Sequence, residues 1–130
     1  MVEVSHAQRE RLEELRRKFG ITLIVAFGSR VKGLSHARSD LDIGILCGRG
    51  FNAAIVSELC EIFAGDDIDV ALLNRADPLL LKEVSEATVL LSGEASDLQE
   101  FRMLAFRRYV EYRPYFALEA EVNARLLAGE

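Results

Sequence analysis

The stretch at residues 28–47, GSRVKGLSHARSDLDIGILC, decides how this chain of 130 residues is interpreted. The apolar run Ile21–Phe27 precedes it, and its own end, DLDIGILC at residues 40–47, is a second apolar run that begins with two aspartates. Short runs of this kind, rich in β-branched residues, are typical of buried strands. The stretch therefore predicts two strands joined by a Gly-Ser turn and a polar loop.

The Gly28-Ser29 pair directly after the first strand has the chemistry of a phosphate cradle. Glycine lets a ligand approach the backbone closely because it has no side chain. Ser29 adds a hydroxyl and is expected to begin a helical turn, whose free N–H groups favour an anion. Arg30 and Lys32 follow, and either contact phosphates or lie exposed; His36 in the next loop is expected to be solvated.

Asp40 and Asp42 are two residues apart, so their side chains share one face of the second strand. Two carboxylates this close repel each other unless a cation lies between them, which predicts a Mg²⁺ site. A third strand is expected at residues 66–73, with Asp69 between apolar neighbours. If that strand lies beside the second, Asp69 completes a three-carboxylate, two-metal site that activates an attacking hydroxyl. The opposite face of the second strand is expected to hold Leu41, Ile43, Ile45 and Cys47.

The rest of the chain predicts mainly helices. Asp77-Pro78 is a helix start, an N-cap followed by proline at the first helical position. A capping box at residues 96–99 begins a long helical region that Pro114 is expected to kink or break. A short strand is expected at residues 88–91. The predicted helices cover residues 5–18, 51–64, 77–87, 96–111 and 114–127.

The length, composition and charge limit the classes of protein to which the chain can belong. A length of 130 residues predicts one domain, residues 1–130, and no run is long and apolar enough for a membrane span. The charged N-terminus lacks the pattern of a signal peptide, so we expect a cytoplasmic protein in which Cys47 and Cys60 are buried free thiols. The net charge of −5 argues against strong nucleic-acid binding, but not against a nucleotide substrate held with a metal.

Gly28-Ser29, ten intervening residues, Asp40-Leu41-Asp42 and the later Asp69 resemble the signature of the DNA-polymerase-β-type nucleotidyltransferases. The chain is similar in length to the minimal nucleotidyltransferases (MNT) among them. This resemblance implies an α/β (α+β) fold with a small mixed sheet packed by helices. It also implies that Gly28, Ser29 and Arg30 bind the phosphates of a nucleoside triphosphate. Asp40 and Asp42 would bind two Mg²⁺ ions, with Asp69 as a shared ligand or as the base.

Many MNT proteins are antitoxins that transfer AMP from ATP onto a tyrosine of a helical HEPN ribonuclease toxin, and the resemblance implies this activity and partner here. Two alternatives are open: an antitoxin that neutralises its partner by contact alone, and a small-molecule transferase of the aminoglycoside-modifying kind. A receiver domain is disfavoured because the only later lysine, Lys82, lies in a predicted helix. The aromatic segment at residues 112–116 is either core or partner surface, and a homo- or hetero-oligomer is possible.

Overall fold

A four-stranded mixed sheet forms the centre of the molecule, with strand order β3-β2-β1-β4. The computed structural model describes residues 3–28, 41–86 and 88–129. The strands are β1 (Ile21–Phe27), β2 (Leu41–Cys47), β3 (Ile68–Leu72) and β4 (Thr88–Gly93). β1 is antiparallel to β2 and to β4, whereas β2 and β3 are parallel. The predicted mixed sheet is confirmed, with the two most apolar strands in its middle.

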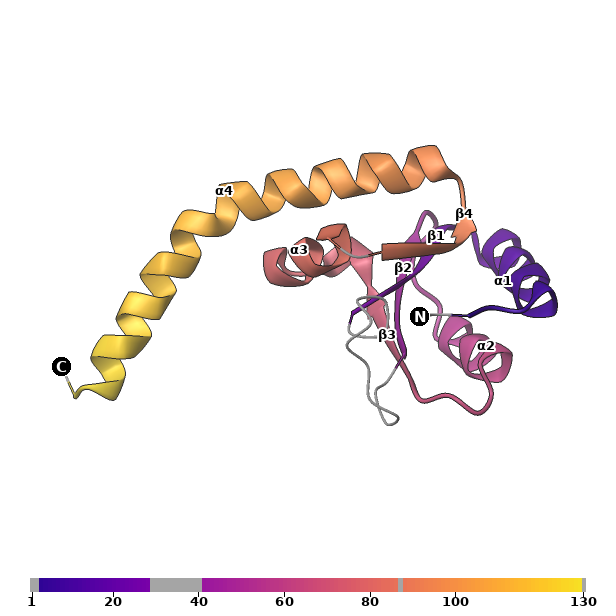
Figure 1. Cartoon of the computed structure of the whole chain (residues 1–130), viewed down its shortest axis with the longest axis horizontal. Coiled ribbons are helices and arrows are strands. Elements are labelled where there is room, and N and C mark those ends of the chain that lie inside the picture. Colours follow the sequence, from indigo (N-terminus) through magenta and orange to yellow (C-terminus); the bar gives the residue numbers. More distant parts are fainter. Residues whose placement is uncertain (1–2, 29–40, 87, 130) are drawn as a thin grey trace.

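Helices cover both faces of this sheet (Figure 1). α1 (His6–Phe19) and α2 (Ala54–Ile62) pack on one face, where they meet the apolar side chains of β2 at every second residue. α3 (Pro78–Glu86) and the first turns of α4 (Ala95–Leu127) pack on the other face. The predicted alternation in β2 is confirmed, because the α1/α2 core contains Leu41, Ile43, Ile45 and Cys47.

Local sequence signals explain both ends of α1 and the start of α3. The Ser5 side chain accepts a hydrogen bond from the Gln8 N–H at the start of α1, and Gly20 ends that helix with a left-handed φ of 65°. Asp77 caps α3 by accepting from the Leu80 N–H at 2.9 Å, as predicted. The predicted cap of α4 is wrong: the cap position is Glu94 and the helix begins at Ala95, directly after the end of β4.

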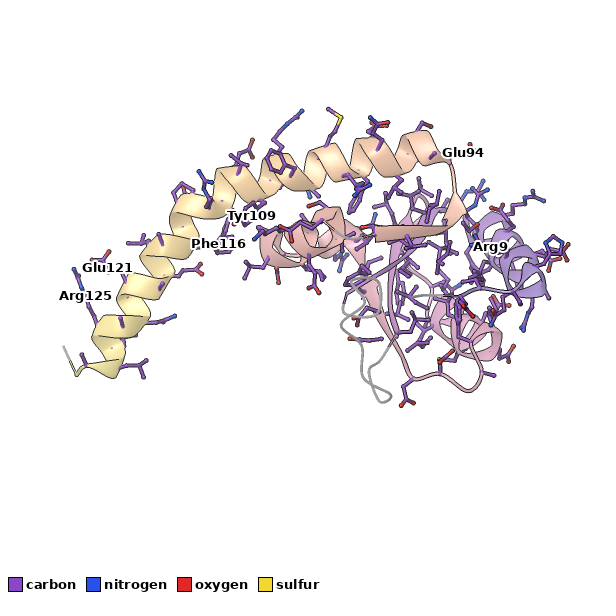
Figure 2. All side chains as sticks on the ribbon, in the orientation of Figure 1. Arg9, Glu94, Tyr109, Phe116, Glu121 and Arg125 are labelled. Carbon is purple, nitrogen blue, oxygen red and sulfur yellow. The ribbon has the colours of Figure 1, made fainter. Side chains whose placement is uncertain are left out.

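Pro114 was expected to kink or break the last helix. α4 continues through Pro114, so the break is wrong, but the helix bends near its middle (Figure 1). Aromatic contacts bridge the proline: the ring centroids of Tyr112 and Phe116 are 4.6 Å apart, and those of Tyr109 and Phe116 are 6.0 Å apart. Figure 2 shows Tyr109 and Phe116 on the side of the helix toward α3. No helix of the described residues, α4 included, is long and apolar enough to cross a membrane.

The two cysteines differ in exposure. Cys47 is buried at the end of β2, and burial raises the pKa of its thiol. Cys60 is exposed, which corrects the expectation that both thiols are buried. The reason is the orientation of α2, whose buried face consists of Ile55, Leu59 and Ile62 and leaves Cys60 on the outer side.

The Asn74 side chain extends the pairing of β2 beyond the end of β3. Its Oδ1 accepts from the Cys47 N–H at 2.8 Å, and its Nδ2 donates to the Cys47 carbonyl at 2.9 Å. Replacing it in Asn74→Ala removes both bonds at once, and we expect the free energy of unfolding to fall by about 1–3 kcal/mol. Urea unfolding measures this loss, and an unchanged midpoint would contradict it.

Candidate active site

Asp42 and Asp69 lie directly opposite each other on adjacent strands. In the parallel pairing of β2 with β3, the partner of Asp42 is Asp69, and the flanking pairs are Leu41 with Ile68 and Ile43 with Val70. Neighbouring strands are about 4.8 Å apart, and paired residues point to the same face. The sequence analysis made Asp69 part of the site on the condition that the third strand lies beside the second. The pairing meets that condition, and the two carboxylates are brought together.

Both aspartates point to the side of the sheet on which α3 and α4 pack. Their apolar neighbours, Leu41 and Ile43 on β2 and Ile68 and Val70 on β3, contribute to the core beneath α1 and α2. Alternation along a strand then places the aspartates on the other face. Asp42 is half-buried and Asp69 is exposed. The pair thus lies where the sheet core meets solvent, accessible to a ligand from outside.

Gly28 closes this site from the end of β1. Its φ is +84°, a region that residues with a side chain rarely adopt, and a Cβ built there would overlap Oδ2 of Asp42. Phe27, the residue before it, is the β1 partner of Asp42. Only glycine therefore fits at this point, and its bare backbone lies against the carboxylate that the sequence assigns to a metal.

The described part of the site fits Mg²⁺ held with a nucleotide. Two in-register carboxylates supply the oxygen ligands that a hard divalent cation prefers, and the backbone at Gly28 has no side chain to obstruct a phosphate. Among the described residues there is no group of three or more acidic, histidine or cysteine side chains arranged for a metal. The other predicted residues lie in the segment 29–40, outside the described residues: Ser29, Arg30, Lys32, His36 and Asp40.

Thr88 is a residue of this region that the sequence analysis did not single out. It begins β4 and is paired with Phe27, so it lies in the same row across the sheet as Asp42 and Asp69. Its Oγ1 is buried and has no hydrogen-bond partner among the described residues. Nothing in the sequence distinguishes this threonine from other strand residues, because its place beside the site depends on the pairing of β4 with β1.

We expect Thr88→Val to raise the free energy of unfolding by about 1 kcal/mol, because it removes a buried hydroxyl that lacks a partner. Thermal or urea unfolding measures this gain. A lower stability would mean that the hydroxyl is satisfied in the folded protein. Ser92→Ala is the matched comparison, since the buried Ser92 hydroxyl donates to Glu13 at 2.7 Å and its loss is expected to destabilise the protein.

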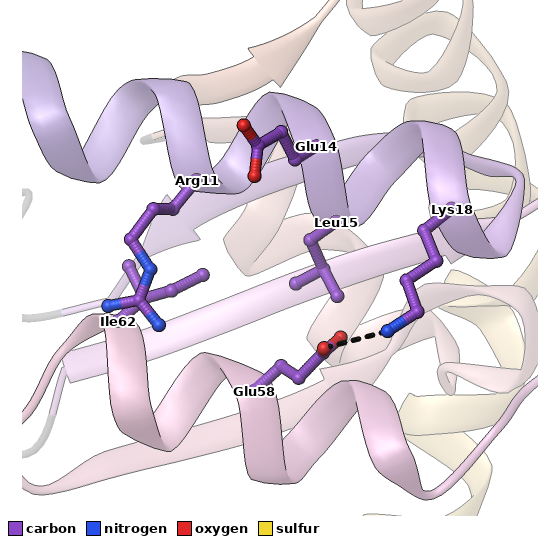
Figure 3. A pocket seen from close by; sticks show the side chains of 6 residues that line it. All are labelled: Arg11, Glu14, Leu15, Lys18, Glu58 and Ile62. Atoms are coloured by element: carbon purple, nitrogen blue, oxygen red, sulfur yellow. Dashed lines mark hydrogen bonds and ion pairs between the residues drawn. The ribbon is translucent and has the colours of Figure 1, made fainter.

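A separate hollow of about 210 Å³ lies between α1 and α2 (Figure 3). Lys18 and Glu58 form an ion pair of 3.1 Å across it, and its floor includes Leu15 and Ile62. Since α1 and α2 cover the sheet face opposite to Asp42 and Asp69, this hollow is not part of the carboxylate site.

Comparison with known families agrees with this geometry. The model of the family described as polymerase beta, nucleotidyltransferase matches residues 10–96, more than half of the chain. The chain belongs to this nucleotidyltransferase family. The match includes β1, β2 and β3, and thus the strands that position Gly28, Asp42 and Asp69. The family resemblance inferred from the Gly-Ser and Asp-Leu-Asp motifs is confirmed.

Solved structures share the fold of this nucleotidyltransferase along nearly the whole chain. A toxin–antitoxin complex with AMP-PNP matches at a TM-score of 0.71 and 23% identity, covering 88% of this chain and 97% of the other. The complex of a tri-AMPylated Shewanella oneidensis HEPN toxin with its MNT antitoxin matches at 0.65 and 22%, covering 89% and 96%. An MntA-HepT toxin–antitoxin structure matches at 0.68 and 20%, covering 91% and 98%. A comparison with curated protein sequences found no match.

Proposed function

We propose that this nucleotidyltransferase transfers AMP from ATP to a hydroxyl group, namely a tyrosine of a helical HEPN toxin, and thereby acts as an antitoxin. The observation on which the proposal rests is the in-register pair Asp42 and Asp69, with Gly28 against the Asp42 carboxylate, in a fold of this family. The solved relatives support the choice of substrate and partner: one is a complex with AMP-PNP, and another contains an AMPylated HEPN toxin.

We assign a separate role to each residue of the proposed site. Gly28 and Ser29 bind the phosphates, and Arg30 adds a positive charge beside them. Asp40, Asp42 and Asp69 would hold two Mg²⁺ ions, which neutralise charge on the phosphates and lower the pKa of the acceptor hydroxyl. Of the two described aspartates, Asp69 is the exposed one, so we assign it the side that faces an acceptor from another molecule.

The reaction exchanges one bond at phosphorus for another. The acceptor oxygen forms a bond to the α-phosphorus of ATP, the bond from that phosphorus to the bridging oxygen breaks, and pyrophosphate leaves with the bonding electrons. The hydroxyl proton passes to a carboxylate, with Asp69 as the proposed base. The protein contributes mainly positioning and charge stabilisation, as in phosphoryl transfer generally.

The test uses ATP labelled at the α-phosphate, Mg²⁺, and the protein encoded beside this chain. We expect label to appear on the neighbouring protein, at a tyrosine located by mass spectrometry, and to depend on added Mg²⁺. Label on no protein, with full protection of cells by the Asp42→Asn variant, would instead establish a contact antitoxin. Label on an aminoglycoside, but not on the protein, would establish the small-molecule transferase.

A further inference from the structure

The second half of α4 is a helix without a partner inside the described molecule. Every residue from 117 to 129 is exposed. Figure 1 shows this part of the helix projecting past α3 and away from the sheet. We call residues 113–127 the C-terminal arm. A helical segment as short as this arm depends on packing for much of its stability. The unpacked arm is therefore more stable once another surface covers it.

The arm presents apolar side chains at the spacing of a helix that fits into a groove. Tyr115, Leu118, Val122 and Leu126 follow one another at intervals of three, four and four residues. Their exposed fractions are 57%, 57%, 46% and 67%. This spacing is the recognition pattern of an amphipathic helix whose apolar face enters a groove on a partner. The four residues are called the arm stripe below.

Exposed apolar side chains are concentrated on α4. Of the large hydrophobic residues that are exposed in the described part of the chain, all except Phe51 and Leu79 belong to this helix. The arm stripe is continuous with a hollow of about 290 Å³ at the start of α3, lined by Pro78, Arg108 and Tyr115 among others. Such concentration on one element is typical of an interaction surface.

The charges near the arm stripe indicate the chemistry of the partner. Arg107 and Arg108 are exposed, and within the described residues the structure records no ion pair for either of them. By contrast, Arg125 on the arm is paired with Glu121 at 2.8 Å; Figure 2 labels both. Two uncompensated guanidinium groups in a chain of net charge −5 fit a surface that offers carboxylates.

The arm also begins on the correct side of the sheet for an acceptor. α4 packs on the face to which Asp42 and Asp69 point, and the aromatic rings near Pro114 join the packed half to the arm. A protein seated on the arm is therefore on the side of the sheet where the carboxylates are exposed, rather than on the side of α1 and α2.

We propose that the C-terminal arm is the docking element for the acceptor protein: the arm stripe enters an apolar groove between helices of that protein, and carboxylates at the groove edge bind Arg107 and Arg108. This inference rests on the proposed function for the identity of the acceptor. It assigns affinity to the arm and leaves the chemical step to the carboxylate site. The two halves of the function are thus separable by mutation.

The test compares two triple variants of the full-length chain. The stripe variant carries Leu118→Glu, Val122→Glu and Leu126→Glu. The matched control carries Ala117→Glu, Ala120→Glu and Ala124→Glu, which add the same charge to the same exposed helix on its opposite side. Affinity for the neighbouring protein is measured by titration, with size and mass measured by light scattering, and binding of Mg²⁺-ATP reports on an intact site.

We expect the stripe variant to bind the neighbouring protein roughly tenfold or more weakly and the control to bind like wild type, with Mg²⁺-ATP binding unchanged in both. The KM for the acceptor should rise while kcat at saturation is retained. Arg108→Glu should weaken the complex and reduce its sensitivity to salt.

Equal affinity of both triple variants would overturn the proposal. The proposal would also be overturned if the stripe variant kept its affinity for the neighbouring protein but turned this chain from a dimer into a monomer. The same holds if it kept that affinity but lost binding to RNA. Failure of the proposed function is distinguishable, because wild-type protein would then bind its neighbour through the arm without labelling it. Conversely, Asp42→Asn should retain this binding and lose only the transfer.

Discussion

Replacing either Asp42 or Asp69 with asparagine is expected to lower the rate of nucleotidyl transfer by about three orders of magnitude. Each change removes a charged oxygen that would hold a divalent cation, and such an ion supplies several kcal/mol of transition-state stabilisation. Label transferred from ATP to the acceptor protein, followed over time, measures the loss. A variant with more than about a tenth of the wild-type rate would contradict the assigned role.

Of these two variants, Asp69→Asn should be at least as stable as wild type. Asp42 and Asp69 are partners in the pairing of β2 with β3, and like charges directly opposite each other are destabilising. Neutralising the exposed Asp69 therefore removes repulsion without opening a cavity. Thermal unfolding without metal or nucleotide tests this, with Glu100→Gln as a control that removes one exposed charge from α4. A large loss of stability would show that Asp69 has a structural role.

Gly28→Ala is expected to lower the transfer rate by about a hundredfold, because an added Cβ overlaps Oδ2 of Asp42 and must displace that carboxylate. A shift of about 1 Å in a reacting group is enough for an effect of this size. The positive φ of +84° adds a backbone cost of about 1–2 kcal/mol, visible as a lower free energy of unfolding. Activity and unfolding are measured on the same preparation.

Gly50→Ala is the matched control for this experiment. Gly50 has a φ of +95°, and a Cβ there meets nothing within 4 Å. Both alanine variants should lose similar stability, whereas only Gly28→Ala should lose activity. If the two variants lost activity equally, the effect would come from backbone strain in the fold and not from the contact between Gly28 and Asp42.

The site was predictable from sequence to the extent that it depends on local order. Gly28 follows an apolar strand and Asp42 begins another, and alternation along that strand places Asp42 opposite the core-facing residues. The period of two is a property of any extended chain, so it holds before the fold is known. The contact between the Gly28 backbone and Asp42 was not predictable, because it depends on the antiparallel register of β1 with β2.

The helix ends show the same contrast between what local sequence predicts and what the tertiary structure decides. Asp77 caps its helix as predicted and Ser5 also caps one, since the bonds they accept come from N–H groups three residues away. The start of α4 was predicted wrongly because the end of β4 at Gly93 sets it, overriding the capping box that the sequence contains. Pro114 was expected to kink or break the helix; α4 bends without breaking, and ring contacts of Phe116 with Tyr109 and Tyr112 connect the two sides of the proline.

By itself, the sequence determined the family and the apolar strands, and it predicted the residues that we propose carry the chemistry, because motif spacing and side-chain alternation are properties of the chain within a few residues. Only the tertiary structure decided that Asp69 pairs with Asp42, that Thr88 shares their row, and that the C-terminal arm projects without a partner. Each of these depends on which distant segments the sheet and the core bring together, and pairing across long chain separations is set by the burial of the whole core rather than by any local signal.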